Sequence, residues 1–136
     1  MADIGGCKLL DLPLHCDKRG NLVAIEGDVD VPFPVRRVFY IYGVQPDAER
    51  GGHAHLSCQQ VLVAIAGMLV VKVDDGRLKR KYRLSSPDVG LYVPAPLWRE
   101  LYDFSPGAVC LALTSEPYDP EDYCRDYGKF VGTVGE

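Results

Sequence analysis

The sequence predicts an all-β fold, arranged as an antiparallel sandwich or barrel, with one short helix close to the C-terminus. Three observations support this prediction. Short runs of apolar and β-branched residues recur at spacings of about 8–12 residues, with turn-forming residues between them. The pair Asp75-Gly76 separates two such runs and is typical of a hairpin turn. Asp119 and Pro120 stand where a helix has its N-cap and its first residue.

The strand-like runs follow one another with turns of Gly, Pro, Asp and Asn between them. The first run ends near Pro13, and residues 17–21 form a turn by composition. Pro32 and Pro34 indicate an extended passage at a sheet edge, because proline cannot donate to a ladder. The expected strands are 8–14, 22–26, 36–42, 59–66, 68–73, 77–84, 90–94, 98–104 and 108–114.

The run 36–42 is a strong strand whose side chains alternate between two faces. One face carries Arg36, Val38, Tyr40 and Tyr42, and the other carries Arg37, Phe39 and Ile41.

The last predicted element is a short helix over residues 119–127. Asp119 serves as its N-cap, and Pro120 occupies the first helical position. Glu121 and Asp122 follow in the first turn, where acidic side chains complement the helix dipole.

The bulk composition is that of an ordinary globular protein. Its 136 residues fit one domain, which we expect to span 1–136, and a chain of this length folds without a metal or a disulfide. The formal net charge of −4 argues against a nucleic-acid or anionic-membrane surface, and no stretch is apolar for long enough to span a membrane. The five cysteines lack a Cys-x-x-Cys pair, which is typical of free thiols in a reducing compartment. We therefore expect a cytoplasmic protein with no nucleic-acid or membrane partner.

The stretch Arg50-Gly51-Gly52-His53-Ala54-His55 places two histidines two residues apart. On a strand, His53 and His55 point to the same face, about 7 Å apart along the backbone. Near neutral pH an imidazole can both accept and donate a proton. Two imidazoles on one wall of a barrel can move protons between adjacent atoms of a ligand, which suits isomerisation next to a carbonyl. The sequence holds no Gly-x-Gly-x-x-Gly or P-loop motif, so we expect no redox cofactor.

The same stretch is similar to the metal-binding pattern of cupins, which are double-stranded β-helix jelly rolls. Gln60 stands where that pattern has a glutamate, and Arg99 stands where it has a third histidine. Glutamine is a poor ligand, and arginine carries a fixed charge that repels a cation. Two imidazoles alone hold a divalent metal weakly. We therefore expect no metal, and proton transfer as the role of the histidines.

Seven motifs between residues 8 and 130 give the sequence a more specific resemblance. They are Arg37-Val38-Phe39-Tyr40-Ile41, Arg50-Gly51-Gly52-His53-Ala54-His55, Gln60-Val61-Leu62, Asp74-Asp75-Gly76, Gly90-Leu91-Tyr92-Val93-Pro94, Trp98-Arg99-Glu100-Leu101-Tyr102-Asp103-Phe104 and Tyr118-Asp119-Pro120-Glu121-Asp122-Tyr123. Together they resemble the sugar 3,4-ketoisomerases, also called WxcM-like, which act on dTDP-4-keto-6-deoxyglucose.

The resemblance implies a cupin-fold isomerase of nucleotide-sugar biosynthesis. Such enzymes move the keto group from C4 to C3 through an enediol, and an aminotransferase then installs a 3-amino group for a surface glycan or an antibiotic sugar. The family uses no metal, and its two catalytic histidines carry over to His53 and His55. The family also implies a homodimer whose N-terminal strands swap between subunits, so that Arg19 or its neighbours reach the partner's site.

Several further residues are candidates for binding the nucleotide sugar. A diphosphate requires cations, and arginine suits it because its planar group donates two parallel hydrogen bonds. Arg37, Arg50 and Arg99 are the candidates for this role. Trp98 and Tyr102 can stack on thymine or on the sugar ring.

Tyr40 is expected to act with the histidines, as a proton relay or as a hydrogen-bond donor to a sugar hydroxyl. Tyr42, on the same face of its strand, and Gln60 complete the expected substrate contacts. Glu100 or Asp103 would orient a histidine.

Two other functions stay open on the sequence alone. A metal-dependent cupin, such as a dioxygenase or an epimerase, would contain stoichiometric iron, zinc or nickel. A non-catalytic cupin would bind the dTDP-sugar without turnover. The sequence also leaves open the configuration of the product at C4 and which histidine is the base. Because some family members have histidine at position 99, Arg99 is either a substrate contact or the replacement of a third proton carrier.

Overall fold

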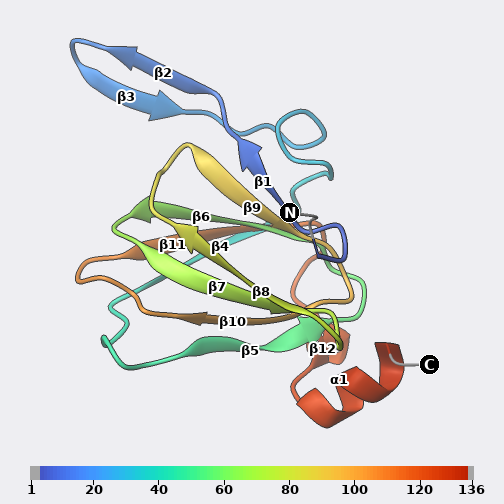
Figure 1. Ribbon diagram of the computed structural model, residues 1–136. Helices are drawn as coiled ribbons and strands as arrows, with labels where there is room; N and C mark the ends of the chain where they lie inside the picture. The colour runs from blue at the N-terminus through green and yellow to red at the C-terminus, as the bar shows by residue number, and fades with distance from the viewer. Residues whose placement is uncertain (1–3, 135–136) are drawn as a thin grey trace.

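The computed structural model describes residues 4–134, and these residues form two five-stranded sheets that face each other (Figure 1). One sheet has the order β1 (Lys8–Asp11), β9 (Val89–Val93), β6 (Gln60–Ala66), β11 (Val109–Thr114) and β4 (Arg37–Tyr42). The other has the order β12 (Tyr123–Cys124), β5 (Arg50–His55), β10 (Trp98–Tyr102), β7 (Leu69–Asp74) and β8 (Lys79–Leu84). Neighbouring strands are antiparallel, which confirms the predicted all-β sandwich.

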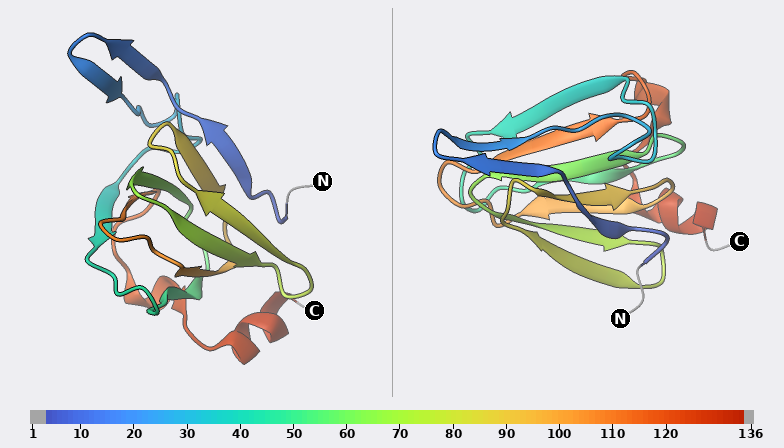
Figure 2. Two further views of the ribbon diagram at one scale, coloured as in Figure 1. Left: turned by 60° about the vertical axis from the view of Figure 1, so that its left-hand side comes forward. Right: turned by 90° about the horizontal axis from the view of Figure 1, so that it is seen from above.

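The N-terminal part of the chain leaves the sandwich as a protruding hairpin. It consists of β2 (Leu14–Asp17) and β3 (Gly20–Val23), which pair only with each other in the described part of the chain. Figures 1 and 2 show this hairpin extending away from both sheets. The strand predicted over 8–14 is therefore two strands separated by Leu12 and Pro13, and the strand predicted over 22–26 ends at Val23.

The helix predicted over 119–127 is wrong in extent. Asp119 caps as expected, because its carboxylate accepts from the Glu121 amide at 3.0 Å, but the helical turn η1 (Pro120–Asp122) ends after three residues. Tyr123 and Cys124 then pair with β5 as β12, and a separate helix α1 (Tyr127–Val134) follows. An N-terminal signature fixes where a helix begins, whereas its length depends on what competes for the next backbone groups. Here, pairing of Tyr123 and Cys124 with β5 ends the helical turn.

The main core lies between the two sheets and takes apolar side chains from both. Buried members of this core are Leu62, Ala64, Leu69, Val71, Val73, Leu84, Leu91, Val93, Leu101, Cys110 and Ala112. Each fully buried Leu or Val contributes about 1.5–3 kcal/mol relative to an exposed position. Gly67 closes β6 in the left-handed region at φ +66°, where an added Cβ would lie 2.8 Å from the Ala108 Cα. The close approach of the β6–β7 turn to Ala108 therefore depends on this glycine.

The outer faces of the sheets are also partly covered. A cluster containing Val31 and Phe33 packs on Val61 and Val63 at the outer face of the first sheet. At the second sheet, α1 covers the outer face through Phe130, which packs on Trp98 and Ala54. The Tyr127 hydroxyl donates to the Asp74 carboxylate at 2.6 Å and holds the start of α1.

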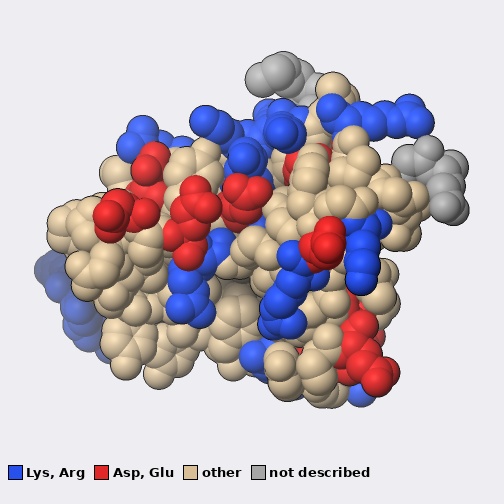
Figure 3. All heavy atoms as spheres, turned by 90° about the horizontal axis from the view of Figure 1, so that it is seen from below, with Lys and Arg blue, Asp and Glu red and all other residues tan. Residues whose placement is uncertain are grey.

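The surface is charged without a single dominant sign. Figure 3 shows Lys and Arg side chains gathered along one edge of the face seen from below, with Asp and Glu side chains beside them. The edge strand β8 exposes Lys79, Lys81 and Arg83, and charged side chains of this kind protect an edge from pairing with another sheet. No helix among residues 4–134 is long and apolar enough to cross a membrane.

Candidate active site

Two imidazoles meet at the end of β5. His53 and His55 lie on the same face of this strand, as predicted, and their Nε2 atoms are 3.3 Å apart. Their rings are almost perpendicular, at 86°. The Tyr123 ring packs against both, with centroid distances of 4.8 Å to His53 and 4.5 Å to His55. The pair is therefore fixed in orientation by its neighbours and can share a proton between the two Nε2 atoms.

The Asp122 carboxylate orients the inner histidine. Its Oδ2 lies 3.0 Å from His55 Nδ1, and its oxygens also accept from the Ser57 amide and hydroxyl, both at 2.8 Å, and from the Cys58 amide at 3.2 Å. Because a carboxylate accepts, His55 donates from Nδ1, and its Nε2 is left as an acceptor toward His53. Hydrogen bonds therefore connect His53 to His55 and His55 to Asp122, in a chain that leads away from the cavity.

Both histidines are uncharged near neutral pH. Burial, followed by the charge of Arg99, lowers the pKa of His53 to about 3 and that of His55 to about 4, although Asp122 acts in the opposite direction on His55. Burial alone would raise the pKa of Asp122, but the hydrogen bonds from Ser57, His55 and Cys58 outweigh it and hold that pKa below its usual range. Asp122 is therefore ionised beside a neutral imidazole.

A cavity of about 410 Å³ opens in front of His53. Its wall contains four arginines, Arg37, Arg50, Arg99 and Arg125, together with Phe39, Ile41, Gln60, Leu62, Leu101 and Tyr123. Aromatic rings hold two of these arginines in place. The Arg37 guanidinium lies 4.7 Å from the Phe39 centroid, and that of Arg125 lies 4.6 Å from the Tyr123 centroid. A wall with four arginines is best suited to bind an anionic ligand.

Arg99 lies at the floor of the cavity and is only 1% exposed. Its guanidinium crosses from the second sheet to the first, because Nη1 donates to the Gln60 Oε1, while Nη2 donates to the Leu97 carbonyl at 3.1 Å. Its Nε has no hydrogen-bond partner among the described residues. Burial lowers the pKa of Arg99 to about 10, so the side chain keeps its charge near neutral pH.

These residues do not fit the metal centre of a cupin. The two positions that lack a ligand side chain, Gln60 and Arg99, bond to each other and place a positive charge beside the histidines. Among residues 4–134, the one group with three metal-binding donors within 4.8 Å of one another is His55, Cys58 and Asp122. The Asp122 oxygens already accept four hydrogen bonds there.

Six of the predicted site residues come together in this structure. They are His53, His55, Arg37, Arg50, Gln60 and Arg99. Tyr40 also contributes to the cavity wall, but its side chain is 62% exposed and its ring stacks on Tyr42 at 6.0 Å on the outward face of β4. The Tyr40 ring is therefore not brought to the histidines, because strand alternation turns Arg37, Phe39 and Ile41 inward instead.

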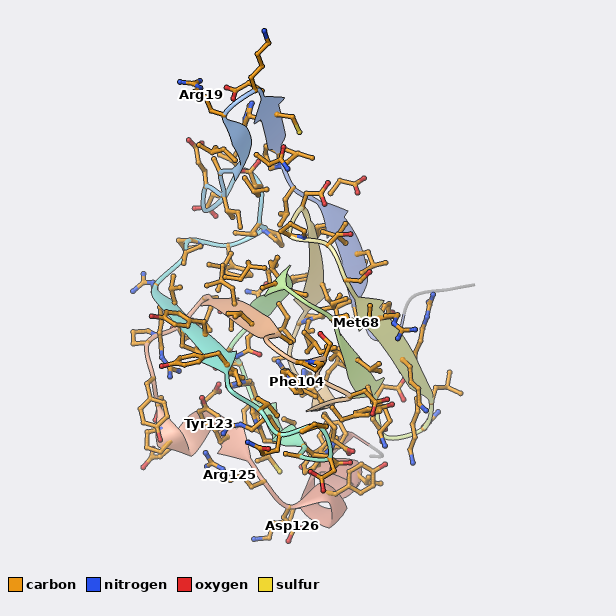
Figure 4. All side chains as sticks on the ribbon, turned by 90° about the vertical axis from the view of Figure 1, so that its left-hand side faces the viewer. Arg19, Met68, Phe104, Tyr123, Arg125 and Asp126 are labelled. Atoms are coloured by element: carbon orange, nitrogen blue, oxygen red, sulfur yellow. The ribbon has the colours of Figure 1, made fainter. Side chains whose placement is uncertain are left out.

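The other predicted contacts are not part of this cavity. Trp98 is buried under α1 and donates to Glu100 at 2.9 Å, so Glu100 does not orient a histidine. Tyr102 is on the same outward face of β10, with Lys81 5.8 Å from its ring centroid. Arg19 lies at the tip of the β2–β3 hairpin, bonded to Asp17 and far from Tyr123 and Arg125 (Figure 4).

Sequence reasoning missed three site residues, Asp122, Tyr123 and Arg125. All three come from the segment that the sequence predicted to be helical, and in Figure 4 Tyr123 and Arg125 lie on that segment, next to β5. The signal available was the polar, Tyr-rich composition of 118–127 directly after the last core strand.

Comparison with known proteins identifies the family. The family model described as FdtA: WxcM-like, C-terminal matches residues 5–135. The chain belongs to this family. A curated relative, the TDP-4-oxo-6-deoxy-alpha-D-glucose-3,4-oxoisomerase of Aneurinibacillus thermoaerophilus, is 42% identical over 123 residues, which cover 90% of this chain and 88% of the relative.

Solved structures of 3,4-ketoisomerases have the same fold. A mutant of the 3,4-ketoisomerase QdtA from Thermoanaerobacterium thermosaccharolyticum, in complex with TDP-4-keto-6-deoxyglucose, gives a TM-score of 0.94 at 36% identity, over 97% of this chain and 96% of that chain. The WlaRB TDP-quinovose 3,4-ketoisomerase from Campylobacter jejuni gives 0.91 at 41% identity, over 95% and 99% of the two chains. These similarities confirm the predicted family and the predicted cupin-type jelly roll.

Proposed function

We propose that the protein is a 3,4-ketoisomerase that converts TDP-4-keto-6-deoxyglucose into its 3-keto isomer. The observation that carries this proposal is the chain of hydrogen bonds from His53 through His55 to Asp122, at the edge of a cavity lined by arginines. The names of the curated relative and of the QdtA complex support the same reaction and the same substrate.

The reaction needs only proton transfers, and the histidine pair can supply them. One imidazole takes the proton from C3, the electrons of the C–H bond form the C3=C4 double bond, and the C4 oxygen becomes negative. The C3 hydroxyl then loses its proton, the C4 oxygen gains one, and a proton returns to the C4 carbon. The products are the C3 ketone and the C4 hydroxyl, so that no oxidant or reductant is consumed. His53 lines the cavity, so we assign it the exchange with the sugar, and His55 accepts or returns the proton behind it.

The three more exposed arginines suit the diphosphate of the substrate. Arg37, Arg50 and Arg125 line the outer part of the cavity, whereas Arg99 is buried at its floor. A nucleoside diphosphate carries its charge away from the reacting sugar carbons. We therefore place the diphosphate at the first three arginines, with the sugar between them and His53.

The dimer is a further part of this proposal. Leu14 and Leu22 on the β2–β3 hairpin are 43% and 58% exposed, and a second copy would cover them. Arg19 at the hairpin tip would then enter the partner's site. We also propose a location in the cytoplasm and a role before an aminotransferase, because a C3 ketone is the group that such an enzyme consumes.

Proton NMR of TDP-4-keto-6-deoxyglucose with the protein in D2O tests the function. We expect the 3-keto product with deuterium at C4, and the coupling constants report the configuration there. His53→Asn and His55→Asn should each lose most of this activity and retain the wild-type circular dichroism spectrum. Activity should persist after chelation and dialysis. Full activity of both histidine variants would refute the proton-transfer role.

A further inference from the structure

Arg99 and His53 are direct neighbours across two strands. Arg99 of β10 lies opposite His53 of β5 in the ladder, so their side chains share the inward face of the second sheet. Gly51, at φ +69°, lies beside both side chains, because a Cβ there would be 3.8 Å from the Arg99 Cγ and 3.9 Å from the His53 Cε1, and only 2.9 Å from the Leu101 Cδ1. A sugar atom that reaches His53 therefore also reaches the region of the Arg99 guanidinium.

The charge of Arg99 is buried without a carboxylate in direct contact with it. No carboxylate among the described residues forms an ion pair with Arg99, and its two hydrogen-bond partners, Gln60 and Leu97, are neutral acceptors. Its Nε is unpartnered. Burial of a charge without an opposite charge in contact costs free energy unless another interaction compensates for it. In a cavity wall, such a charge indicates where a negative charge appears during the reaction.

We propose that Arg99 is a catalytic residue whose guanidinium stabilises the enediolate, by binding the C3 and C4 oxygens as negative charge develops on them. This inference rests on the proposed ketoisomerase function and adds a role that a diphosphate contact would not have. The carbonyl oxygen of the substrate is neutral and the enediolate oxygen is charged. The interaction with Arg99 is therefore stronger in the transition state than in the bound substrate, which is the condition for acceleration.

The charges around the histidines are arranged for this separation of charge. When the C3 proton moves to the imidazole pair, the positive charge arises beside Asp122 and the negative charge arises beside Arg99. His53 faces Arg99, Arg125, Tyr123 and His55. His55 faces Asp122 and is also influenced by Arg99 and Arg37. Burial and the charge of Arg99 together keep both imidazoles unprotonated. Neutralisation of Arg99 by the enediolate removes the second of these effects, so both transferred charges are stabilised in the same step.

Steady-state kinetics of arginine-to-glutamine variants test the inference. Arg99→Gln should lower kcat by about 10²–10³-fold with little change in KM, as expected for loss of one oxyanion donor. Arg50→Gln should instead raise KM with kcat nearly unchanged. Arg83→Gln, exposed on β8 and outside the site, serves as the unaffected control. Arg99→Lys retains the charge and should recover part of the lost kcat.

A second measurement does not depend on turnover. NMR titration of the free protein should show the pKa values of His53 and His55 rising in Arg99→Gln toward the ordinary value, whereas those of Arg99→Lys stay low. The acid limb of kcat/KM should move to higher pH in the same variant. If Arg99→Gln does not fold, the comparison of Arg99→Lys with wild type tests the inference. Because the charge is retained, we expect kcat to fall by less than about tenfold.

Three results would overturn the inference. One is an active Arg99→Gln with kcat within threefold of wild type and a raised KM, which is the behaviour of a simple substrate contact. Another is a folded Arg99→Lys no more active than Arg99→Gln, since the charge would then be irrelevant. The third is the absence of any isomerisation by wild type in D2O, which refutes the proposed function itself and is distinguished from the other two by the wild-type measurement.

Discussion

At the scale of single residues, the hydrogen bond between His55 Nδ1 and Asp122 determines which nitrogen carries the proton. The Asp122 carboxylate can only accept, so it fixes the tautomer in which His55 Nε2 faces His53 as an acceptor. An amide at position 122 can donate instead, and it would favour the other tautomer. The chemistry of the pair therefore depends on a side chain 67 residues away in the sequence.

The variant Asp122→Asn should retain the fold and lower kcat by about 10–10²-fold, because an oriented tautomer is part of general acid–base catalysis. Kinetics combined with ¹⁵N NMR of the imidazole nitrogens measures both the rate and the tautomer. Glu121→Gln is the matched control, because Glu121 is the exposed neighbour in the same turn. Unchanged kcat together with an altered His55 tautomer would contradict this role of Asp122.

The two neutral histidines also make stability depend on pH. Their pKa values are about 3 and 4 in the folded protein and near 6.5 in the unfolded chain, so the unfolded chain binds more protons between these limits. The free energy of unfolding should therefore fall as the pH is lowered from about 6.5 toward 4, and Asp122 adds to the loss below its ordinary pKa of 3.8. Urea unfolding at several pH values between 7 and 4 measures this slope. His53→Asn should give a shallower slope, and equal slopes would refute the assignment.

At the scale of elements, the C-terminal segment links packing to catalysis. η1 carries Asp122, and β12 pairs with β5 beside the histidines. α1 packs on Trp98 through Phe130, and Cys124 of β12 lies against the same cluster. The helix has eight residues and is marginal by itself, so its position depends on the packing of Phe130.

The variant Phe130→Ala should destabilise this segment by about 3 kcal/mol, the lower end for loss of a buried phenylalanine. Because α1 packs on the outer face of the second sheet and not between the sheets, hydrogen exchange of β12 and α1 should accelerate more than that of β6 and β11. The loss of order at Asp122 should lower kcat in parallel. Lys129→Ala, exposed on the same helix, is the control. Uniform acceleration in all strands would contradict this local role.

The sequence predicted the strands well where alternation and turn residues agreed. The hairpin around Asp75-Gly76 is confirmed, with β7 ending at Asp74 and β8 beginning at Lys79. Alternation assigned Arg37 and Tyr40 to opposite faces, but it does not say which face of a strand is inward, so both were kept as site residues. The same limit explains Trp98 and Arg99, which are adjacent in β10 and point to opposite sides of the second sheet.

At the scale of the whole molecule, local patterns predicted the histidine pair because both members lie on one strand. They did not predict Asp122, Tyr123 and Arg125, since these meet the histidines only when the C-terminal segment closes the sheet at β5. The hydrogen bond and the ladder that bring them there join residues more than 60 positions apart. The single domain over 1–136 and the swapped dimer stay predictions.

The protruding β2–β3 hairpin allows the swapped dimer to be tested by complementation. If Arg19 serves the neighbouring subunit, then Arg19→Ala and His53→Asn homodimers are each impaired. Both sites of the first lack the arginine from the partner subunit, and both sites of the second lack His53. Subunits exchanged between them form hybrids in which one of the two sites is intact. Mixing two poorly active preparations should therefore restore activity, and no gain after verified subunit exchange would show that each copy works with its own residues alone.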